Sequence, residues 1–263
     1  MIHVGIVSRT ATYWPLYLLA REGVVDLVEL GSTAAGVDAL LDHRVDVAAT
    51  CPDVLIARGA PLRIAAGLVD RPPAWLVARA GVPSVAELRG RRVATTAAQG
   101  SVSIFLRAFL RAHGLARGDY AEVVVGPTPL QALALERGEV DAAMLTAPID
   151  ERLVARGFRR LAHVGDALGP CAFTTVNVRA GWTSSDPWVP LRDAFAGAIA
   201  RLRDDDGRAR ELAVLAEETA SAPAAPPRVT YDARVDASAL ERLLGFLRAE
   251  GVATSDARAY VEG

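Results

Sequence analysis

Polar side chains, most of them small hydroxyl residues, follow the first two buried, strand-like segments of this sequence. They are Ser8, Arg9, Thr10 and Tyr13 after the first segment, and Ser32 and Thr33 after the second. Hydroxyl groups at such positions can hold a small ligand by hydrogen bonds, and Arg9 could clamp an anion with two parallel N–H donors. The flat ring of Tyr13 could stack on an aromatic ligand. The alternative for Arg9 is an ordinary solvent-exposed side chain.

A second polar group lies in the stretch TTAAQGSVS at residues 95–103, which leads into a strongly periodic helix expected over 101–113. Its candidate ligand-binding residues are Thr95, Thr96, Gln99, Gly100 and Ser101. A glycine-containing turn before a helix presents backbone N–H groups that have no partner inside the helix, at the positive end of the helix dipole. Such corners accept carboxylate, sulfonate or phosphate oxygens. The alternative is that the Ser and Thr side chains only cap the helix.

Groups suited to covalent or metal chemistry are sparse. Thr50 and Cys51 follow a third strand at a helix start, and both are candidate ligand-binding residues. A helix start lowers the pKa of a thiol, which makes Cys51 the one credible nucleophile. The four histidines show no metal-ligand spacing, and the absence of lysine excludes Schiff-base chemistry. His43 precedes the strand that ends before Cys51, so it should lie at the far end of that strand. We therefore assign no catalytic residue, metal or cofactor, and only an enzyme function would make Cys51 and Arg9 catalytic.

One short pattern occurs twice, roughly a domain apart. ALLDHRVDVAATCPDVLIARG covers residues 39–59, and ALALERGEVDAAMLTAPIDERLVARG covers residues 132–157. Each copy has a helical stretch, a polar turn, Val-Asp, a small apolar run, a threonine (Thr50 or Thr146), a proline and Ala-Arg-Gly. Chance is the alternative in so alanine-rich a chain. We predict two equivalent strand-to-helix corners, one in each of two similar sheets, with Thr146 as a further candidate ligand contact.

The elements that would position these residues alternate between strand and helix. We expect strands at 2–7, 26–30, 45–49, 62–69, 75–78, 92–95, 122–125, 140–145 and 172–178, with helices between most of them and a mainly helical segment after 178. A capping box at Ser84 and Glu87 predicts one further short helix. Alternation of this kind indicates an α/β fold with mainly parallel sheets. Two facing α/β lobes would form a ligand cleft outside the carboxyl ends of their strands.

Three stretches resemble the solute-binding proteins of ABC importers, of the nitrate/sulfonate/taurine and thiamine-pyrimidine-precursor type. They are IVSRTATYWPLYLLAREG, LRGRRVATTAAQGSVSIFLRAFLRAHGL and GEVDAAMLTAPI, and the resemblance extends over roughly residues 2–178. It implies the type II periplasmic-binding-protein fold. Lobe one would be residues 1–81 and 179–263 and lobe two residues 82–178, with hinge strands near 78–83 and 175–179.

The same resemblance implies a function. The protein would bind a small organic anion or a flat heterocyclic acid between its lobes, and a membrane component of an ABC transporter would be its partner. The alternative is an intracellular enzyme on the same scaffold, a lyase of the decarboxylase, desulfinase or menaquinone-route dehydratase type.

The composition of the chain limits which partners it can bind and in which compartment we expect it. The net charge of −2 and a pI near 6.1 give no basic field for nucleic acid. No apolar run approaches the roughly 20 residues that span a bilayer, so we expect no direct membrane insertion. No leader peptide is visible, which predicts a cytoplasmic protein if the chain is complete, and a periplasmic or extracellular one if a leader was removed.

Overall fold

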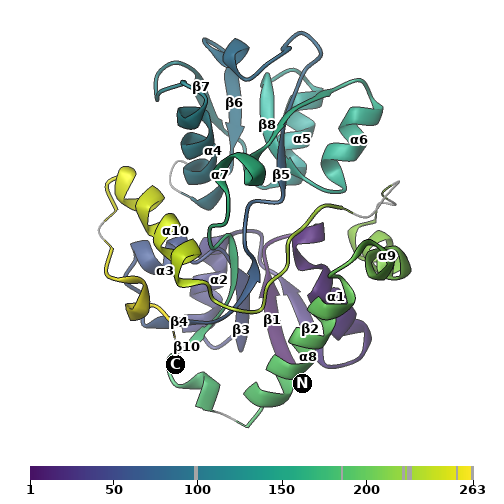
Figure 1. Ribbon diagram of the computed structural model, residues 1–263, viewed down its shortest axis with the longest axis vertical. Coiled ribbons are helices and arrows are strands. Elements are labelled where there is room, and N and C mark those ends of the chain that lie inside the picture. Colours follow the sequence, from purple (N-terminus) through teal and green to yellow (C-terminus); the bar gives the residue numbers. More distant parts are fainter. Residues whose placement is uncertain (98–99, 185, 221–222, 224–226, 253, 262–263) are drawn as a thin grey trace. The chain divides into compact units, whose positions relative to one another are not determined.

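The computed structural model of the chain describes residues 1–97, 100–184, 186–220, 223, 227–252 and 254–261. The chain divides into two compact units (Figure 1). Unit 1 comprises Met1–Arg71 and Pro170–Gly263, and unit 2 comprises Pro72–Gly169. Both crossings between the units come earlier in the chain than the lobe boundaries expected after residues 81 and 178.

Unit 1 is built on a five-stranded sheet in the order β2-β1-β3-β10-β4. Its strands are β1 (Ile2–Ile6), β2 (Val25–Glu29), β3 (Val47–Thr50), β4 (Leu62–Val69) and β10 (Thr174–Arg179). β10 runs antiparallel to both β3 and β4, so the other four strands share one direction. The helices are α1 (Trp14–Arg21), α2 (Thr33–Leu41), α3 (Asp53–Ala57), α8 (Trp188–Arg201), α9 (Asp205–Thr219) and α10 (Ala237–Ala249). α1 packs against β2 and against α8 and α9 of the C-terminal segment.

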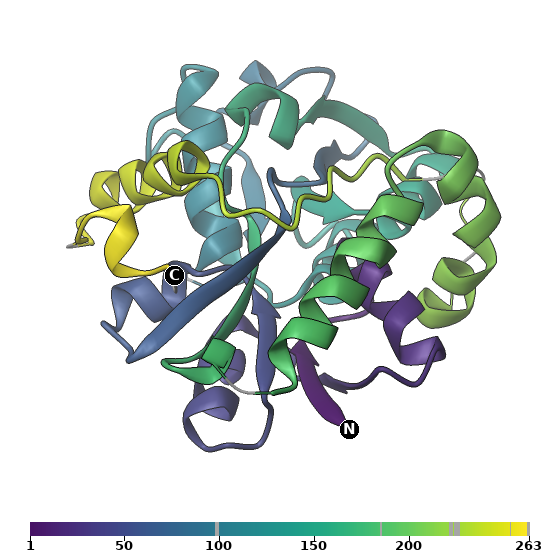
Figure 2. The ribbon, with the colours of Figure 1, turned by 60° about the horizontal axis from the view of Figure 1, so that its bottom comes forward.

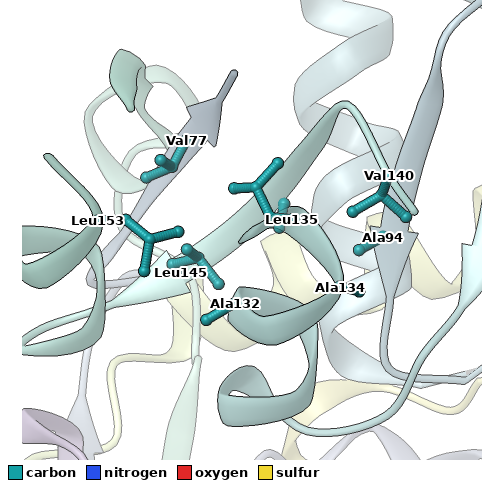
Figure 3. Packing of buried hydrophobic residues seen from close by; sticks show 9 residues of the cluster. Val77, Ala94, Ala132, Ala134, Leu135, Val140, Leu145 and Leu153 are labelled. Atoms are coloured by element: carbon teal, nitrogen blue, oxygen red, sulfur yellow. The ribbon is translucent and has the colours of Figure 1, made fainter. Parts of the chain in front are cut away.

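Unit 2 repeats this plan with the order β7-β6-β8-β5-β9. Its strands are β5 (Ala74–Ala78), β6 (Arg92–Thr95), β7 (Ala121–Val124), β8 (Ala142–Thr146) and β9 (Arg159–His163), and its helices are α4 (Ser101–Ala112), α5 (Thr128–Glu136), α6 (Ile149–Ala155) and α7 (Val164–Leu168). The reversed strand is β5, which pairs antiparallel with β8 and β9. Val77 and Leu145 of the sheet pack with Leu135 of α5 and Leu153 of α6 in one buried cluster (Figure 3).

The predicted repeat is confirmed as two equivalent corners in two different sheets. β3 and β8 are the central strands of their sheets, and α3 and α6 follow them. Asp46 Oδ2 accepts the backbone N–H of His3 in β1 at 2.9 Å, and Asp141 Oδ2 accepts that of Arg92 in β6 at 2.9 Å. The shared Val-Asp therefore performs one task twice, because each aspartate ties the entry of the central strand to its parallel neighbour.

Several local expectations need correction. The predicted capping box at Ser84 and Glu87 is wrong. The structure has only a single 3-10 turn at Ala86–Leu88, and its N-cap is Val85 rather than Ser84. β9 and α7 were not expected, because β9 opens with two arginines and lacks a clear apolar alternation. The expected hinge strands are regular members of sheets instead: β5 lies wholly in the sheet of unit 2 and β10 wholly in the sheet of unit 1.

The outer edge of β4 is covered by chain from the C-terminal segment. Residues 230–233, called the β4 cover below, run antiparallel to β4 beside Val69, and Figure 2 shows the chain that leads into α10 crossing one end of this strand. The Gly67 N–H donates to the carbonyl of Ala233 at 3.0 Å, and the Asp232 N–H donates to that of Leu68 at 3.2 Å. The Ile64 N–H donates to the Tyr260 carbonyl at 2.8 Å. An edge that would otherwise invite intermolecular pairing is thereby occupied.

Gly67→Ala should loosen the β4 cover. A Cβ at this position would lie 2.5 Å from the Asp232 carbonyl oxygen and closer still to that of Arg234, and both are backbone atoms that cannot rotate away. We expect a loss of about 1–3 kcal/mol in the stability of unit 1, the usual range for overpacking. Chemical denaturation and hydrogen exchange of residues 62–69 measure it. Gly245→Ala in α10, which meets open space, is the matched control and should not destabilise; equal behaviour of the two variants would contradict this packing.

Within the described ranges, no helix has both the length and the apolar character to cross a membrane.

Candidate functional site

The corners after β1, β2 and β3 meet at one edge of the sheet in unit 1. Tyr13 lies at this meeting point with only 5% of its side chain exposed. Burial raises the pKa of its hydroxyl far above the ordinary value, and the nearby Cys51 and Glu29 raise it as well. Thr10 is also buried, and its backbone N–H donates to the Tyr17 hydroxyl at 2.9 Å. The predicted residues Thr10, Tyr13 and Cys51 are thus brought together as a largely neutral, hydroxyl-rich corner.

Arg9 is held by carboxylates of the protein. Its guanidinium pairs with Glu218 of α9, and its Nε lies 3.7 Å from Glu29 at the end of β2. The guanidinium carbon also lies 6.0 Å from the ring centre of Tyr17. The Arg9 side chain is thus 39% exposed but paired within the protein, and an external anion would compete with two internal carboxylates.

Ser32 and Thr33 begin α2, and the capping interpretation holds for Ser32. Its Oγ accepts the Ala35 N–H at 3.1 Å, as a helix N-cap does. Thr33 is the first residue of the helix, and Ser8 lies half-buried in the loop after β1. The Ser32 hydroxyl is therefore already used to cap α2, whereas Ser8 caps none of the described helices.

Thr50 anchors a buried polar network that includes two residues not predicted from the sequence. Asn177 of β10 donates through Nδ2 to the Thr50 carbonyl at 3.0 Å and to its hydroxyl at 3.1 Å. The Thr175 hydroxyl donates to Asn177 Oδ1 at 2.7 Å. All three residues are at most 2% exposed. The network fixes the carboxyl end of β3 against the reversed strand, and only the pairing of these distant strands could have revealed it.

Both cysteines are buried thiols. Cys51 directly follows β3, and His43 lies in the turn before that strand, so the two occupy opposite ends of it as predicted. Burial raises the pKa of Cys171 to about 12, which leaves it protonated and inert at neutral pH.

Sequence reasoning missed a cavity in unit 1. It has a volume of about 230 Å³ and lies where β4 ends and β10 begins, under the β4 cover. Its polar lining includes Asp70, Thr174, Thr175, Asp232, Arg234 and Asp236. Arg234 donates to both carboxylate oxygens of Asp232, at 3.2 and 2.9 Å, and this contact lowers the pKa of Asp232. The cavity lining is therefore mixed, since Leu68, Val69 and Val235 also contribute to it, and Arg234 is already paired with Asp232.

In unit 2 the end of β6 is held by side-chain hydroxyls. Thr95 is fully buried and its Oγ1 hydrogen-bonds to the Ser103 hydroxyl of α4, which also donates to the Ala97 carbonyl. Thr95 thus serves to fix the corner. Gln99, another predicted contact, lies outside the described residues.

The start of α4 has no side-chain cap, a property that it shares with the start of α8, where Pro187 is the N-cap. Gly100 is its N-cap and offers no side-chain acceptor, whereas Ser32, Asp204 and Asp236 accept backbone N–H groups at α2, α9 and α10. Ser101 is the first helical residue and is 7% exposed. The helix is twelve residues long, so its dipole is well developed at this end. An anionic oxygen is the natural complement of such a start.

Thr96 and Thr146 lie at the same edge of this sheet, both half-buried. The Thr96 hydroxyl receives a long contact of 3.4 Å from Nε2 of Gln131 in α5. The same Nε2 donates to the Gly126 carbonyl at 2.8 Å. Gln131 carries no local sequence signal, because it stands among apolar positions of its helix.

Two ion pairs stiffen the elements around these corners. Arg107 of α4 and Glu122 of β7 form two parallel hydrogen bonds of 2.7 and 2.6 Å, with side chains 5% and 15% exposed. Asp150 of α6 is buried and accepts two hydrogen bonds from Arg160 of β9, at 2.9 and 2.6 Å. Burial raises the pKa of Asp150, and Arg160 opposes that rise.

Over the described ranges, no group of three or more His, Cys, Asp or Glu side chains could hold a metal ion. The described corners offer hydroxyls, amides and a helix start to a ligand.

Comparisons with known proteins agree with this geometry. A family model described as NMT1/THI5 like matches residues 20–167, more than half of the chain. The alkanesulfonate-binding protein SsuA from Xanthomonas axonopodis pv. citri, bound to MOPS, superposes with a TM-score of 0.81 at 19% identity, over 99% of this chain and 97% of that one. The periplasmic nitrate-binding protein NrtA from Synechocystis PCC 6803 gives 0.70 at 17% identity, over 84% and 67%.

An enzyme also shares the fold. The desulfurization enzyme DSZB gives a TM-score of 0.66 at 17% identity, over 99% of this chain and 96% of that one. No curated protein matches the sequence. At these identities the structural likeness establishes the fold alone, the two-lobed α/β fold of periplasmic binding proteins.

Proposed function

The chain belongs to the NMT1/THI5-like family, and on this premise we propose that it is a solute-binding protein for a small organic acid. The ligand would be held by polar strand-end corners such as the one at the start of α4. A membrane component of an ABC transporter would then read the ligand-bound form. The similar solved structures include binding proteins for an alkanesulfonate and for nitrate, which supports an anionic ligand.

The observation that carries the proposal is the start of α4. Its N-cap is a glycine without a side-chain acceptor, and its first residue, Ser101, has a hydroxyl beside the leading N–H groups. A carboxylate or sulfonate there would receive charge-assisted hydrogen bonds from neutral donors. Arg9 supports the proposal less than the sequence suggested, because Glu29 and Glu218 already neutralise it.

Ser101→Asp should weaken ligand binding sharply. The new carboxylate would occupy the helix-start N–H groups and repel an acidic ligand. Loss of one charge-assisted hydrogen bond corresponds to about 1.5–3 kcal/mol, or roughly 10- to 150-fold in Kd, before repulsion is added. Calorimetry with the acid that co-purifies with the protein, identified by mass spectrometry, measures the change. Ser84→Asp, an exposed loop position in the same unit, is the control and should leave Kd unchanged; equal affinities of both variants and wild type would remove Ser101 from the site.

Lyase activity on the same scaffold is the second candidate, favoured by one observation. Cys51 stands at the carboxyl end of β3 beside the Tyr13 hydroxyl, in a fold shared with the desulfurization enzyme DSZB. Incubation with the identified acid separates the two functions. A binding protein returns the acid intact at one equivalent per chain, whereas an enzyme converts many equivalents and loses that turnover in Cys51→Ala.

A further inference from the structure

One amide oxygen in unit 2 has no visible use in the fold. Gln131 of α5 is fully buried, and none of the described residues hydrogen-bonds its Oε1. A buried carbonyl oxygen without a partner is destabilising, and native proteins rarely retain one without a function. The described residues of unit 2 therefore do not account for this atom.

The orientation of this amide is fixed by its other end. Nε2 donates to the Gly126 carbonyl at 2.8 Å. Exchanging the amide oxygen and nitrogen would bring two acceptors to that distance, which is repulsive. Oε1 is therefore the atom left over, and it belongs to the same planar group that contacts the Thr96 hydroxyl.

The position of this amide links it to the proposed binding corner. Thr96 follows β6 and Gly126 follows β7, and both are half-buried residues at the carboxyl ends of neighbouring parallel strands. Gln131 lies in the first half of α5, and its Nε2 contacts both of these residues. An amide oxygen can only accept a hydrogen bond, whereas the hydroxyl and N–H groups that we assign to the unit 2 corner can all donate one, so Oε1 is suited to a donor on the ligand.

We propose that Gln131 is a specificity-determining residue whose Oε1 accepts a hydrogen bond from an N–H or O–H group of the ligand. This inference rests on the proposed function and adds to it: the bound acid carries a hydrogen-bond donor as well as an anionic group. Acids that offer only acceptors, such as nitrate or an unsubstituted alkanesulfonate, would leave the amide oxygen unpaired. Discrimination between otherwise matched acids follows from that difference.

A library of organic acids arranged in matched pairs tests this. Examples are 3-aminopropanesulfonate with propanesulfonate, 4-aminobenzoate with benzoate, and 6-hydroxynicotinate with nicotinate. Thermal-shift measurements on the wild-type protein identify the binding acids, and calorimetry gives their Kd values. We expect each binding acid to carry a donor, and its donor-free partner to bind at least tenfold more weakly.

The variant Gln131→Met tests whether Gln131 causes the preference for the donor-bearing acid. It should reduce the preference within each pair to less than threefold, because methionine offers no comparable acceptor. Equal binding of both members by the wild-type protein would overturn the inference whether or not the variant folds. So would a preference that survives in a folded Gln131→Met, or a crystal structure with an acid bound and only water on Oε1. A library in which no acid binds would instead refute the proposed function, and the role of Gln131 with it.

Discussion

Glu122→Gln should lower the stability of unit 2 by about 3 kcal/mol, the low end of the range for removing one partner of a buried ion pair. Arg107 is the reason, since its guanidinium is 5% exposed and is bound in bidentate fashion by Glu122. An arginine cannot shed its proton at any accessible pH. The variant must therefore keep a poorly compensated charge between α4 and β7, or open that contact to water.

Hydrogen exchange resolved over α4, β6 and β7 measures this loss where it occurs. Glu139→Gln is the matched control, because Glu139 makes an exposed pair with Arg137 at 3.9 Å in the same unit. Exposed pairs contribute about 0–1 kcal/mol, so this variant should change little. The two variants behaving alike would mean that the Arg107–Glu122 pair does not hold α4 to the sheet.

The second large effect depends on pH. Arg160→Met should destabilise unit 2 by about 3 kcal/mol at neutral pH, because it leaves the fully buried Asp150 carboxylate without its ion partner. The pKa of Asp150 is already raised by burial, and Arg160 is the main influence that lowers it. Removing Arg160 raises that pKa further, so the folded variant holds the proton more tightly than the unfolded chain does.

The sign of the pH dependence follows from that difference. A carboxyl group with a raised pKa in the folded state contributes most stability below its unfolded pKa, about 3.9, and loses that contribution as the pH rises through the folded pKa. The deficit of Arg160→Met should therefore shrink as the pH falls from 7.5 toward 4.5. Denaturation over this pH series measures it, with the exposed neighbour Arg159→Met as control. Adding Asp150→Asn should restore most of the stability at neutral pH; a deficit independent of pH would contradict the account.

The sequence was sufficient for the architecture because its strongest signals are local. Buried runs such as Leu62–Val69 and the repeated Val-Asp corners specify strands and their ends without knowledge of distant contacts. β9 was not predicted because the contacts that allow it to form come from distant parts of the sequence. Its Arg160 is accommodated in the sheet by Asp150 of α6 and by the ring of Trp75 in β5, 5.1 Å from the guanidinium carbon.

Some residues of the candidate site could likewise be predicted from local sequence, whereas others could not. Strand-end hydroxyls such as Thr10, Thr96 and Ser101 can be located from sequence, because a strand end followed by a helix start is a local event. The pairing of Arg9 with Glu218 spans 209 residues, and no sequence period encodes it. Asn177 and Gln131 have roles only because β10 reverses into one sheet and α5 packs on the other.

The position of β10 also governs the order in which the molecule can be completed as it is synthesised. β10 lies between β3 and β4, yet it follows β4 only after all of unit 2 has been made. At about 5–20 residues per second, translation of the intervening residues 70–173 takes on the order of 5–20 s. Unit 2 is one continuous stretch and can fold in that interval. Until β10 and the cover have been made, β4 has no hydrogen-bonding partner on either side. We therefore expect this strand to be exposed to intermolecular pairing in the nascent protein.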